Sequence, residues 1–229
     1  MLRIIIRINW QYSNSHEIRM MQIIPGILEK DWNTIETKLE QIRTFTNAAH
    51  IDIIDGKFVN NKSFLDPEPF RKYAAELFLE LHMMVVGPVE FVEQWAAAGF
   101  KRFLGHAEHM TSQKEFVEEA KKYGEVGLAL DGPTHISQIR VPFEQLDSIL
   151  VYTSNRVGFS GPSMMDDRLD KVRHLKRLTN ISIEVDGGIN DRTIVRAKDA
   201  GANRFVSTSF IWQSQTCAEQ YKKLIEAIS

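Results

Sequence analysis

Two histidines and two aspartates stand at the ends of short apolar runs, where they could share a metal ion. His50 and Asp52 lie two apart in one run, so both side chains point to the same face of a strand. His82 ends a second run, and Asp186 ends a third, directly before two glycines. Taken singly, each histidine is more often a hydrogen-bonded structural group, and an aspartate before glycines is as readily a turn residue. Together they favour a mixed nitrogen and oxygen site, which suits Zn, Fe(II), Mn or Co.

Two carboxylates facing each other across such a metal suit proton transfer at carbon. One of Asp52 and Asp186 could remove a proton from a carbon next to a ketone, which gives an enediolate. The other could return a proton from the opposite face and invert the centre. A metal ion would stabilise the enediolate oxygens as a Lewis acid.

Three glycine- or hydroxyl-rich turns could bind an anion. They are Gly158-Phe159-Ser160-Gly161, Gly187-Gly188 and Thr208-Ser209, and each follows an apolar run. Each alone reads as an ordinary turn between a strand and a helix. Together, with backbone N–H groups in the last two, they fit a phosphorylated substrate.

The elements that must position these residues follow one repeated pattern, in which a short β-branched run leads through a loop to an amphipathic stretch. Pro88 precedes a helical stretch with Phe91 and Trp95 four apart, and Tyr221 begins a closing amphipathic helix. Gly99 and Gly201 fit left-handed helix ends before strands. The runs predict eight strands: Gln22–Ile24, Ala49–Ile54, Leu77–His82, Arg102–Gly105, Val126–Leu130, Ser148–Thr153, Ile181–Asp186 and Arg204–Ser207.

Eight such repeats predict one closed (β/α)₈ TIM barrel over residues 21–229. The competing open, doubly wound sheet would carry a GxGxxG turn after its first strand, and Pro25-Gly26-Ile27-Leu28 is not one. Residues 1–20 are unlike the rest and form an N-terminal extension of uncertain status. They are either an extra strand or arm, or a product of start-site choice, because Met20 and Met21 offer later starts. Their apolar core is too short for a secretory signal.

Composition excludes several classes of protein. Apolar residues make up 43% of the 229 residues and charged residues 25%, which is typical of a globular chain. The net charge of −2 gives no basic footprint for nucleic acid or an anionic membrane. The single cysteine, Cys217, can form neither an internal disulfide nor a cysteine-based zinc site, so we expect a cytoplasmic location. No apolar run approaches the length of a membrane helix.

The chain resembles the ribulose-phosphate 3-epimerase family from about Met21 to its C-terminus. The motifs that carry the resemblance are Pro25-Gly26-Ile27-Leu28, the run from His50 to Val59 (His-Ile-Asp-Ile-Ile-Asp-Gly-Lys-Phe-Val), Leu81-His82-Met83-Met84, His106-Ala107-Glu108, Gly158-Phe159-Ser160-Gly161 and the run from Glu184 to Asn190 (Glu-Val-Asp-Gly-Gly-Ile-Asn). The family consists of metal-dependent (β/α)₈ enzymes that interconvert ribulose 5-phosphate and xylulose 5-phosphate.

The resemblance implies a role for each group of residues. His50, Asp52, His82 and Asp186 would bind one divalent metal ion, and Asp52 and Asp186 would also be the catalytic acid and base at the third carbon. Binding of the substrate and its phosphate would fall to Gly26, Met84, Gly158, Gly161, Gly187, Gly188, Thr208 and Ser209. We expect a sugar phosphate as the small-molecule partner, and a homo-oligomer.

Several positions depart from the family pattern. Gly26 stands where the family usually has a serine that contacts substrate, and Thr208 stands where it usually has glycine. Because threonine adopts glycine's backbone angles less easily, we expect the approach to phosphate to differ. Ile54 and Tyr152 replace methionines that commonly line the site, and the loop from Asn155 to Gly161 carries an extra residue.

These departures leave two further hypotheses open. The same chemistry could act on another ketose phosphate, such as a hexulose 6-phosphate, or the chain could be a catalytically idle sugar-phosphate-binding paralogue. Other prominent residues read as structural: Asp131-Gly132-Pro133 as a turn, His106 and His109 as a pair in a loop, and the tryptophans as packing residues.

Overall fold

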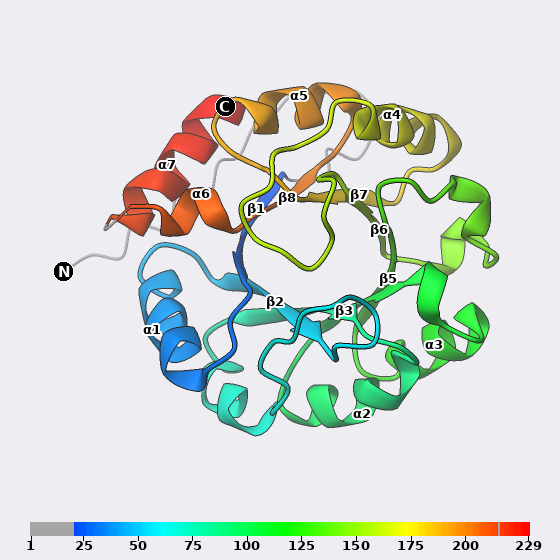
Figure 1. Cartoon of the computed structure of the whole chain (residues 1–229), viewed down its shortest axis with the longest axis horizontal. Coiled ribbons are helices and arrows are strands. Elements are labelled where there is room, and N and C mark those ends of the chain that lie inside the picture. The colour runs from blue at the N-terminus through cyan, green and yellow to red at the C-terminus, as the bar shows by residue number, and fades with distance from the viewer. Residues whose placement is uncertain (1–20, 215) are drawn as a thin grey trace, which may run out of the picture.

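The eight predicted strands form a closed parallel barrel in the computed structural model, which describes residues 21–214 and 216–229. Each strand pairs with its neighbours in chain order, and β1 closes the ring against β8 through pairs such as Pro25 with Ser207. Figure 1 shows the strands as an inner ring and the helices around it. The strands are β1 (Gln22–Ile27), β2 (Ala48–Ile54), β3 (Phe78–Met84), β4 (Arg102–His106), β5 (Glu125–Leu130), β6 (Ser148–Tyr152), β7 (Ser182–Asp186) and β8 (Arg204–Ser207).

The outer layer contains helices of unequal length. Short 3₁₀ turns replace a long helix between β2 and β3 and between β5 and β6. The α-helices are α1 (Trp32–Ile42), α2 (Val89–Ala97), α3 (Gln113–Ala120), α4 (Arg168–Leu178), α5 (Thr193–Ala200), α6 (Ser209–Trp212) and α7 (Cys217–Ile228). The 3₁₀ turns are η1 (Glu68–Tyr73), η2 (Ala107–His109), η3 (Ile136–Gln138) and η4 (Phe143–Gln145). The predicted single (β/α)₈ barrel is therefore confirmed, while the predicted extension, residues 1–20, lies outside the described residues.

Local sequence signals explain where several elements begin and end. The Asp31 carboxylate accepts the Thr34 N–H at the start of α1, and the Ser112 hydroxyl oxygen accepts the Glu115 N–H at the start of α3. Gly201 ends α5 with a φ of +110°, as predicted for a left-handed helix end. The first strand is longer than predicted, because the chain stays extended through Pro25 while its pairing passes from β8 to β2.

Among the described residues, two clusters of buried apolar side chains stabilise the barrel. The larger fills the space between strands and helices and includes fully buried Trp95, Phe70 and Phe205. The smaller lies inside the barrel and is formed by Leu104, Ala129, Leu150 and Tyr152. The strands also carry buried charged residues, among them Glu80, Arg102 and Glu184, whose charge has to be paired or neutralised.

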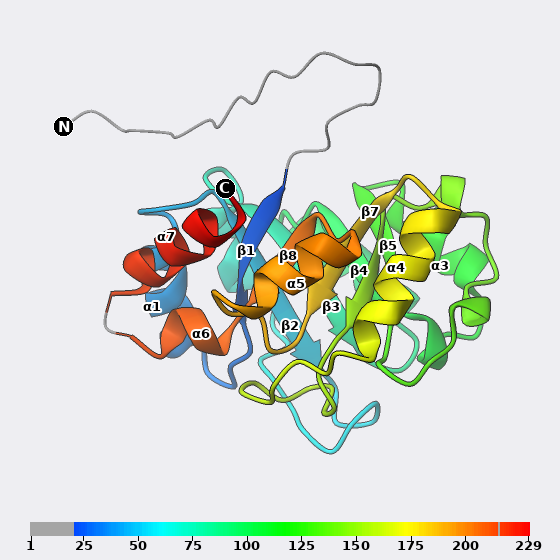
Figure 2. The ribbon, with the colours of Figure 1, turned by 90° about the horizontal axis from the view of Figure 1, so that it is seen from above.

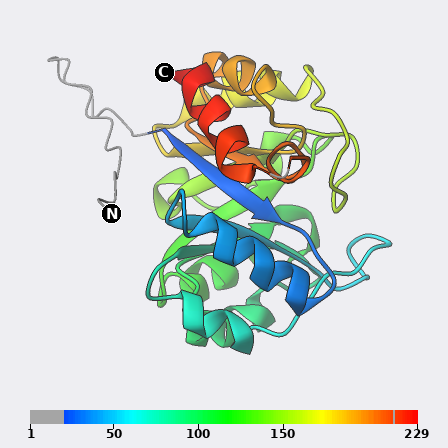
Figure 3. The same cartoon turned by 90° about the vertical axis from the view of Figure 1, so that its left-hand side faces the viewer.

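All parallel strands of a barrel end on the same side, and the long loops gather there. Figure 3 shows β1 pointing toward the end from which the loops after β2 and β6 project, and Figure 2 shows both loops leaving that same end. This end is where a (β/α)₈ barrel carries its site. Within the described part of the chain, no helix has the length and apolar character needed to cross a membrane.

Candidate active site

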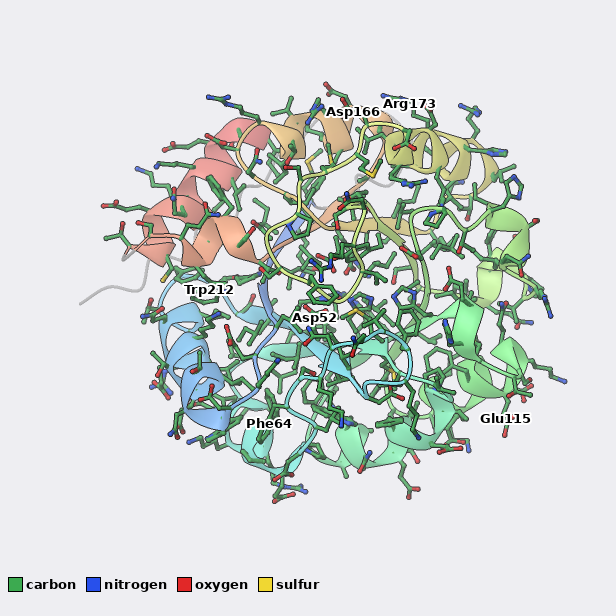
Figure 4. The ribbon with its side chains drawn as sticks, viewed as in Figure 1. Asp52, Phe64, Glu115, Asp166, Arg173 and Trp212 are labelled. Carbon is green, nitrogen blue, oxygen red and sulfur yellow. The ribbon has the colours of Figure 1, made fainter. Side chains whose placement is uncertain are left out.

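The four predicted metal ligands meet at the carboxyl ends of three strands. His50 and Asp52 come from β2, His82 from β3 and Asp186 from β7. One ligand atom from each residue lies within 4.8 Å of the others. The two imidazoles are fully buried and each carboxylate residue is 6% exposed. Figure 4 shows Asp52 near the centre of the ring of strands.

Hydrogen bonds orient the imidazoles so that one nitrogen of each faces the carboxylates. His50 Nδ1 lies 2.5 Å from Glu80 Oε1 and donates to it. Its other nitrogen, Nε2, is 3.2 Å from Asp52 Oδ1 and 4.0 Å from Asp186 Oδ2. His82 presents Nδ1 at 2.8 Å from Asp52 Oδ1 and 3.5 Å from Asp186 Oδ2. Two imidazole nitrogens and two carboxylates therefore converge on one point.

The pKa values of three of these groups indicate what kind of ion would bind between the two carboxylates. Burial opposes charge on Asp52, but hydrogen bonds and charge from His50 and His82 lower the pKa of Asp52 to about 2. Burial likewise opposes charge on His82, yet its hydrogen bonds to Asp186 and Asp52 raise the pKa of His82 to about 8. The pKa of His50 is raised well above its usual value, against the effect of burial, by Asp52 and Glu80. The carboxylates thus demand positive charge between them, which a divalent cation can supply in place of the protons.

A second layer of charge lies beneath the four ligands. Burial opposes ionisation of Glu80, but Arg102 and His50 lower the pKa of Glu80 below its usual range. Arg102 donates to Glu80 and, through Nε at 2.7 Å, to Glu125. In contrast, burial and the neighbouring Glu80 raise the pKa of Glu184 to about 8, so Glu184 is neutral at pH 7. This layer holds His50 by its Nδ1–H, as metal-binding histidines are commonly held.

Glu80 and Glu184 are absent from the predicted site, although a signal for them exists. Each stands two residues before a predicted ligand, Glu80 before His82 and Glu184 before Asp186. Residues two apart on a strand point to the same face, so these carboxylates had to lie one layer deeper in the same barrel.

A pocket of about 400 Å³, open to solvent, lies above the ligands. Asp52 and Asp186 border it, whereas His50, His82 and Gly26 do not. Its lining includes these predicted substrate-binding residues: Met84, Gly158, Gly161, Gly187, Gly188, Thr208 and Ser209. Phe159 and Ser160 of the predicted anion-binding turn also line it, as does Tyr152, which was expected in place of a site-lining methionine. The lining residues that were not predicted are Leu28, Pro162, Ile189 and Val206.

The loop after β6, which borders this pocket, is tied both to β6 and to the loop after β2. The Tyr152 hydroxyl donates to the carbonyl of Arg156 at 3.1 Å, and the carbonyl of Phe159 lies 3.4 Å from the same hydroxyl. From the loop after β2, the Asn61 side-chain amide donates to the carbonyl of Gly158 at 2.8 Å. Figure 1 shows these loops crossing the mouth of the barrel. Tyr152 therefore fixes the shape of the β6 loop.

The turn after β7 requires its two glycines. Gly187 has a φ of +107° and Gly188 a φ of +74°, which L side chains rarely adopt. A Cβ on Gly188 would also lie 2.1 Å from the backbone nitrogen of Met164. The turn after β8 has no such requirement, because Thr208 has a φ of −104°. Thr208 therefore adopts no backbone conformation that needs glycine, while the expected difference in the approach to phosphate stays a prediction.

Gly26 and Thr208 occupy each other's space. A Cβ on Gly26 would lie 2.1 Å from the Thr208 hydroxyl oxygen and 3.2 Å from the Thr208 Cβ. Gly26 has no positive φ, so its backbone does not demand glycine. Thr208 therefore explains why position 26 has no side chain, and it brings a hydroxyl to this part of the pocket.

The predicted loop position of His106 is wrong. His106 is the last residue of β4, is fully buried and lies with Nε2 at 2.9 Å from His82 Nε2. His109 ends the short 3₁₀ turn η2 that follows β4, and its ring packs on Phe58 at 4.3 Å between ring centroids. The strand extends one residue beyond the predicted end, since Gly105 does not break it, and this carries His106 into the barrel. The turn at Asp131 is confirmed by the bond from Thr134 N–H to the Asp131 carbonyl.

Comparison with known proteins agrees with this geometry. Residues 22–212 match the Ribulose-phosphate 3 epimerase family. Ribulose-phosphate 3-epimerase of Schizosaccharomyces pombe is 31% identical over 205 residues, which is 86% of this chain and 90% of that protein. The same-named protein of Chlamydia pneumoniae is 33% identical over 212 residues, covering 88% of this chain and 92% of that protein.

A solved structure shares the fold at much lower identity. KGPDC from Streptococcus mutans superposes with a TM-score of 0.70 over 92% of this chain and 98% of that one, at 11% identity. The barrel, the family match and the similarity along most of the chain lead to one conclusion. The protein belongs to the ribulose-phosphate 3-epimerase family, a family of isomerases.

Proposed function

We propose that the protein is a metal-dependent epimerase that inverts the third carbon of ribulose 5-phosphate to give xylulose 5-phosphate. The observation that carries the proposal is the placement of Asp52 and Asp186. Both border the pocket, and both lie within 3.5 Å of the same nitrogen of His82. Two carboxylates at one point can act on one carbon from different sides.

Each proton transfer uses one carboxylate. An ionised carboxylate, either Asp52 or Asp186, takes the proton from the third carbon, and the electron pair of that C–H bond forms a double bond to the second carbon. The carbonyl electrons move onto oxygen, which gives an enediolate. The other aspartate, in its protonated form, then donates a proton to the opposite face of the third carbon, and the carbonyl reforms. No atom is gained or lost, and the centre is inverted.

The proposed metal site consists of His50, Asp52, His82 and Asp186. Two neutral imidazole nitrogens with two carboxylate oxygens suit Zn, Fe(II), Mn or Co. When bound, the metal would supply a Lewis acid that stabilises negative charge on the substrate oxygens. The buried Glu80 supports the site by holding the Nδ1–H of His50.

Phosphate would bind at the other side of the pocket. Gly187, Gly188, Thr208 and Ser209 border it, and turns after the seventh and eighth strands are where barrels usually bind phosphate through backbone N–H groups. Gly158, Gly161 and Met84 would enclose the sugar. Gly26 has no direct place in this proposal, because it does not line the pocket.

Exchange with solvent tests the reaction directly. Incubation with ribulose 5-phosphate in D₂O is expected to place deuterium on the third carbon, and Asp186→Asn and Asp52→Asn are expected to abolish this. Asp147→Asn is a matched control. Asp147 directly precedes β6, accepts the backbone N–H of Val126 and is distant in sequence from the proposed metal ligands. Undiminished exchange in Asp186→Asn would refute the mechanism.

The same assay separates the other hypotheses. A panel of ketose phosphates compared by kcat/KM is expected to favour the pentulose, and a preference for a hexulose 6-phosphate would redirect the proposal to that substrate. Absence of exchange with every sugar would indicate an idle sugar-phosphate-binding protein. We further propose a cytoplasmic location, supported by the buried free thiol of Cys217. The homo-oligomer stays a prediction.

A further inference from the structure

A line of buried and half-buried polar groups leads from His82 to the turn after β5. His82 Nε2 lies 2.9 Å from His106 Nε2, and the two rings stack with their centroids 5.0 Å apart. His106 Nδ1 lies 3.2 Å from Glu108 Oε2. The other oxygen of Glu108 accepts the N–H of Asp131 at 2.8 Å. The line therefore runs from a proposed metal ligand, through an imidazole and a carboxylate, to the backbone.

The protons along this line can be assigned from its far end. Burial opposes ionisation of Glu108, but hydrogen bonds from His106 and Asp131 lower the pKa of Glu108 to about 2, so Glu108 can only accept. His106 Nδ1 must therefore carry a proton. His106 Nε2 and His82 Nε2 lie 2.9 Å apart, so one of these nitrogens must donate to the other, and a His106 ring whose single proton is on Nδ1 can only accept at Nε2. The donor between the two rings is then the Nε2–H of His82.

We propose that His106 and Glu108 are positioning residues for metal binding, because they fix His82 in the form that offers Nδ1 to a divalent cation. The inference rests on the metal site of the proposed function. With its proton on Nε2, neutral His82 carries a lone pair on Nδ1, which is the nitrogen directed at Asp52 and Asp186. Groups that hold the second nitrogen of a ligand histidine fix its ring and its protonation in this way.

The backbone end of the line is itself held. Lys171, from α4, donates from Nζ to the carbonyls of Asp131 at 2.7 Å and Gly132 at 2.9 Å. These bonds fix the turn after β5, whose Asp131 N–H holds Glu108. Asp131 thus connects the Glu108 carboxylate to the end of β5. Because Glu108 is held in place in this way, it can set the orientation of His106.

Glu108→Gln tests the direction of the hydrogen bonds. In this variant the amide oxygen of Gln accepts the Asp131 N–H, so the NH₂ group of the same side chain faces His106 Nδ1. That nitrogen must then accept, which moves the His106 proton to Nε2 and the His82 proton to Nδ1, the nitrogen needed for the metal. We expect Zn²⁺ to bind about 10–100-fold more weakly, measured by competition with a chromophoric chelator. The control Asp147→Asn is expected to bind as wild type.

Nuclear magnetic resonance can locate the protons on the His82 and His106 rings before any metal is added. Long-range ¹H–¹⁵N spectra of the metal-free wild-type protein are expected to show His106 with its proton on Nδ1. A proton on Nε2 would overturn the inference, as would equal zinc affinity in Glu108→Gln and wild type. If wild type itself bound no Zn²⁺, Mn²⁺ or Co²⁺, the proposed metal site would fail, which is a separate result.

A second pair of variants distinguishes orientation from mere packing. His106→Gln can place a carbonyl oxygen where Nε2 lies now and accept from His82, whereas the shorter side chain of His106→Asn cannot reach. We expect His106→Gln to bind Zn²⁺ several-fold more tightly than His106→Asn, with thermal unfolding used to check that both are folded. Equal affinity of the two variants would show that His106 only fills space and would overturn the inference.

Discussion

The pairing of Gly26 with Thr208 gives a quantitative prediction about why these two positions differ from the family pattern together. Gly26→Ser introduces a Cβ 2.1 Å from the Thr208 hydroxyl oxygen and 3.1 Å from a methyl carbon of Val206. Rotation of the Thr208 side chain about its Cα–Cβ bond would relieve the first contact but not the 3.2 Å approach to the Thr208 Cβ. Overpacking of this kind costs about 1–3 kcal/mol.

The prediction is that this cost depends on Thr208. In the Thr208→Gly background the obstructing hydroxyl and Cβ are gone and only the 3.1 Å approach to Val206 remains, so Gly26→Ser should cost much less. The double-mutant cycle should therefore give a coupling of about 1–3 kcal/mol, within the range seen for residues in contact. For a domain of this size, the single variant should lower Tm by roughly 2–12 °C.

Chemical denaturation of the four proteins measures the coupling, and kcat/KM for ribulose 5-phosphate measures its effect on the site. A serine at position 26 would place a hydroxyl beside the pocket where Thr208 now supplies one, so the double variant should be more active than either single variant. The control is Gly105→Ser, which meets Phe116 and Met110 instead and should cost the same in both backgrounds. If Gly26→Ser also cost the same in both, Thr208 would not be the reason for Gly26.

The remaining predictions concern a loop, a helix and a carboxylate. Tyr152→Phe removes the hydroxyl that holds the β6 loop, so KM for the sugar phosphate should rise several-fold in steady-state kinetics while zinc affinity is unchanged; a change in zinc affinity alone would contradict this. Ser112→Ala removes the acceptor for the Glu115 N–H at the start of α3 and should lower the free energy of unfolding by about 1 kcal/mol in urea, with no effect on kcat. The folded pKa of Glu108, about 2, lies below its ordinary value of 4.5, so its ionisation stabilises the fold above pH 4.5. That stability should be lost as the pH falls from 4.5 to 2, and the difference in unfolding free energy between wild type and Glu108→Gln should shrink over this window; a constant difference would refute it.

The strand pattern and the strand-end residues could be read from the sequence because both depend on local rules. A spacing of two places His50 and Asp52 on one face wherever the strand lies, and parallel strands end on one side of a barrel. These rules lead to all eight strands and to the four residues that meet at their carboxyl ends. The same spacing of two, applied to the residues before His82 and Asp186, also predicts that Glu80 and Glu184 point into the barrel.

Other features depend on which strands are neighbours and how far their side chains reach. His106 reads as a loop residue in sequence, yet the extra residue of β4 buries it against His82. The ionisation of Glu184 follows from burial near Glu80, which comes from a strand far earlier in the chain.

The sequence by itself therefore determined the (β/α)₈ pattern, the family and the set of residues that carry chemistry, because period and residue type are local properties. The tertiary structure alone decided how those residues are held. It showed that Thr208 fills the space beside Gly26, that Tyr152 fixes the β6 loop and that Glu108 holds His106. The first of these joins segments distant in sequence, and all three depend on strand ends and loops that only the closed barrel brings within hydrogen-bonding or packing distance.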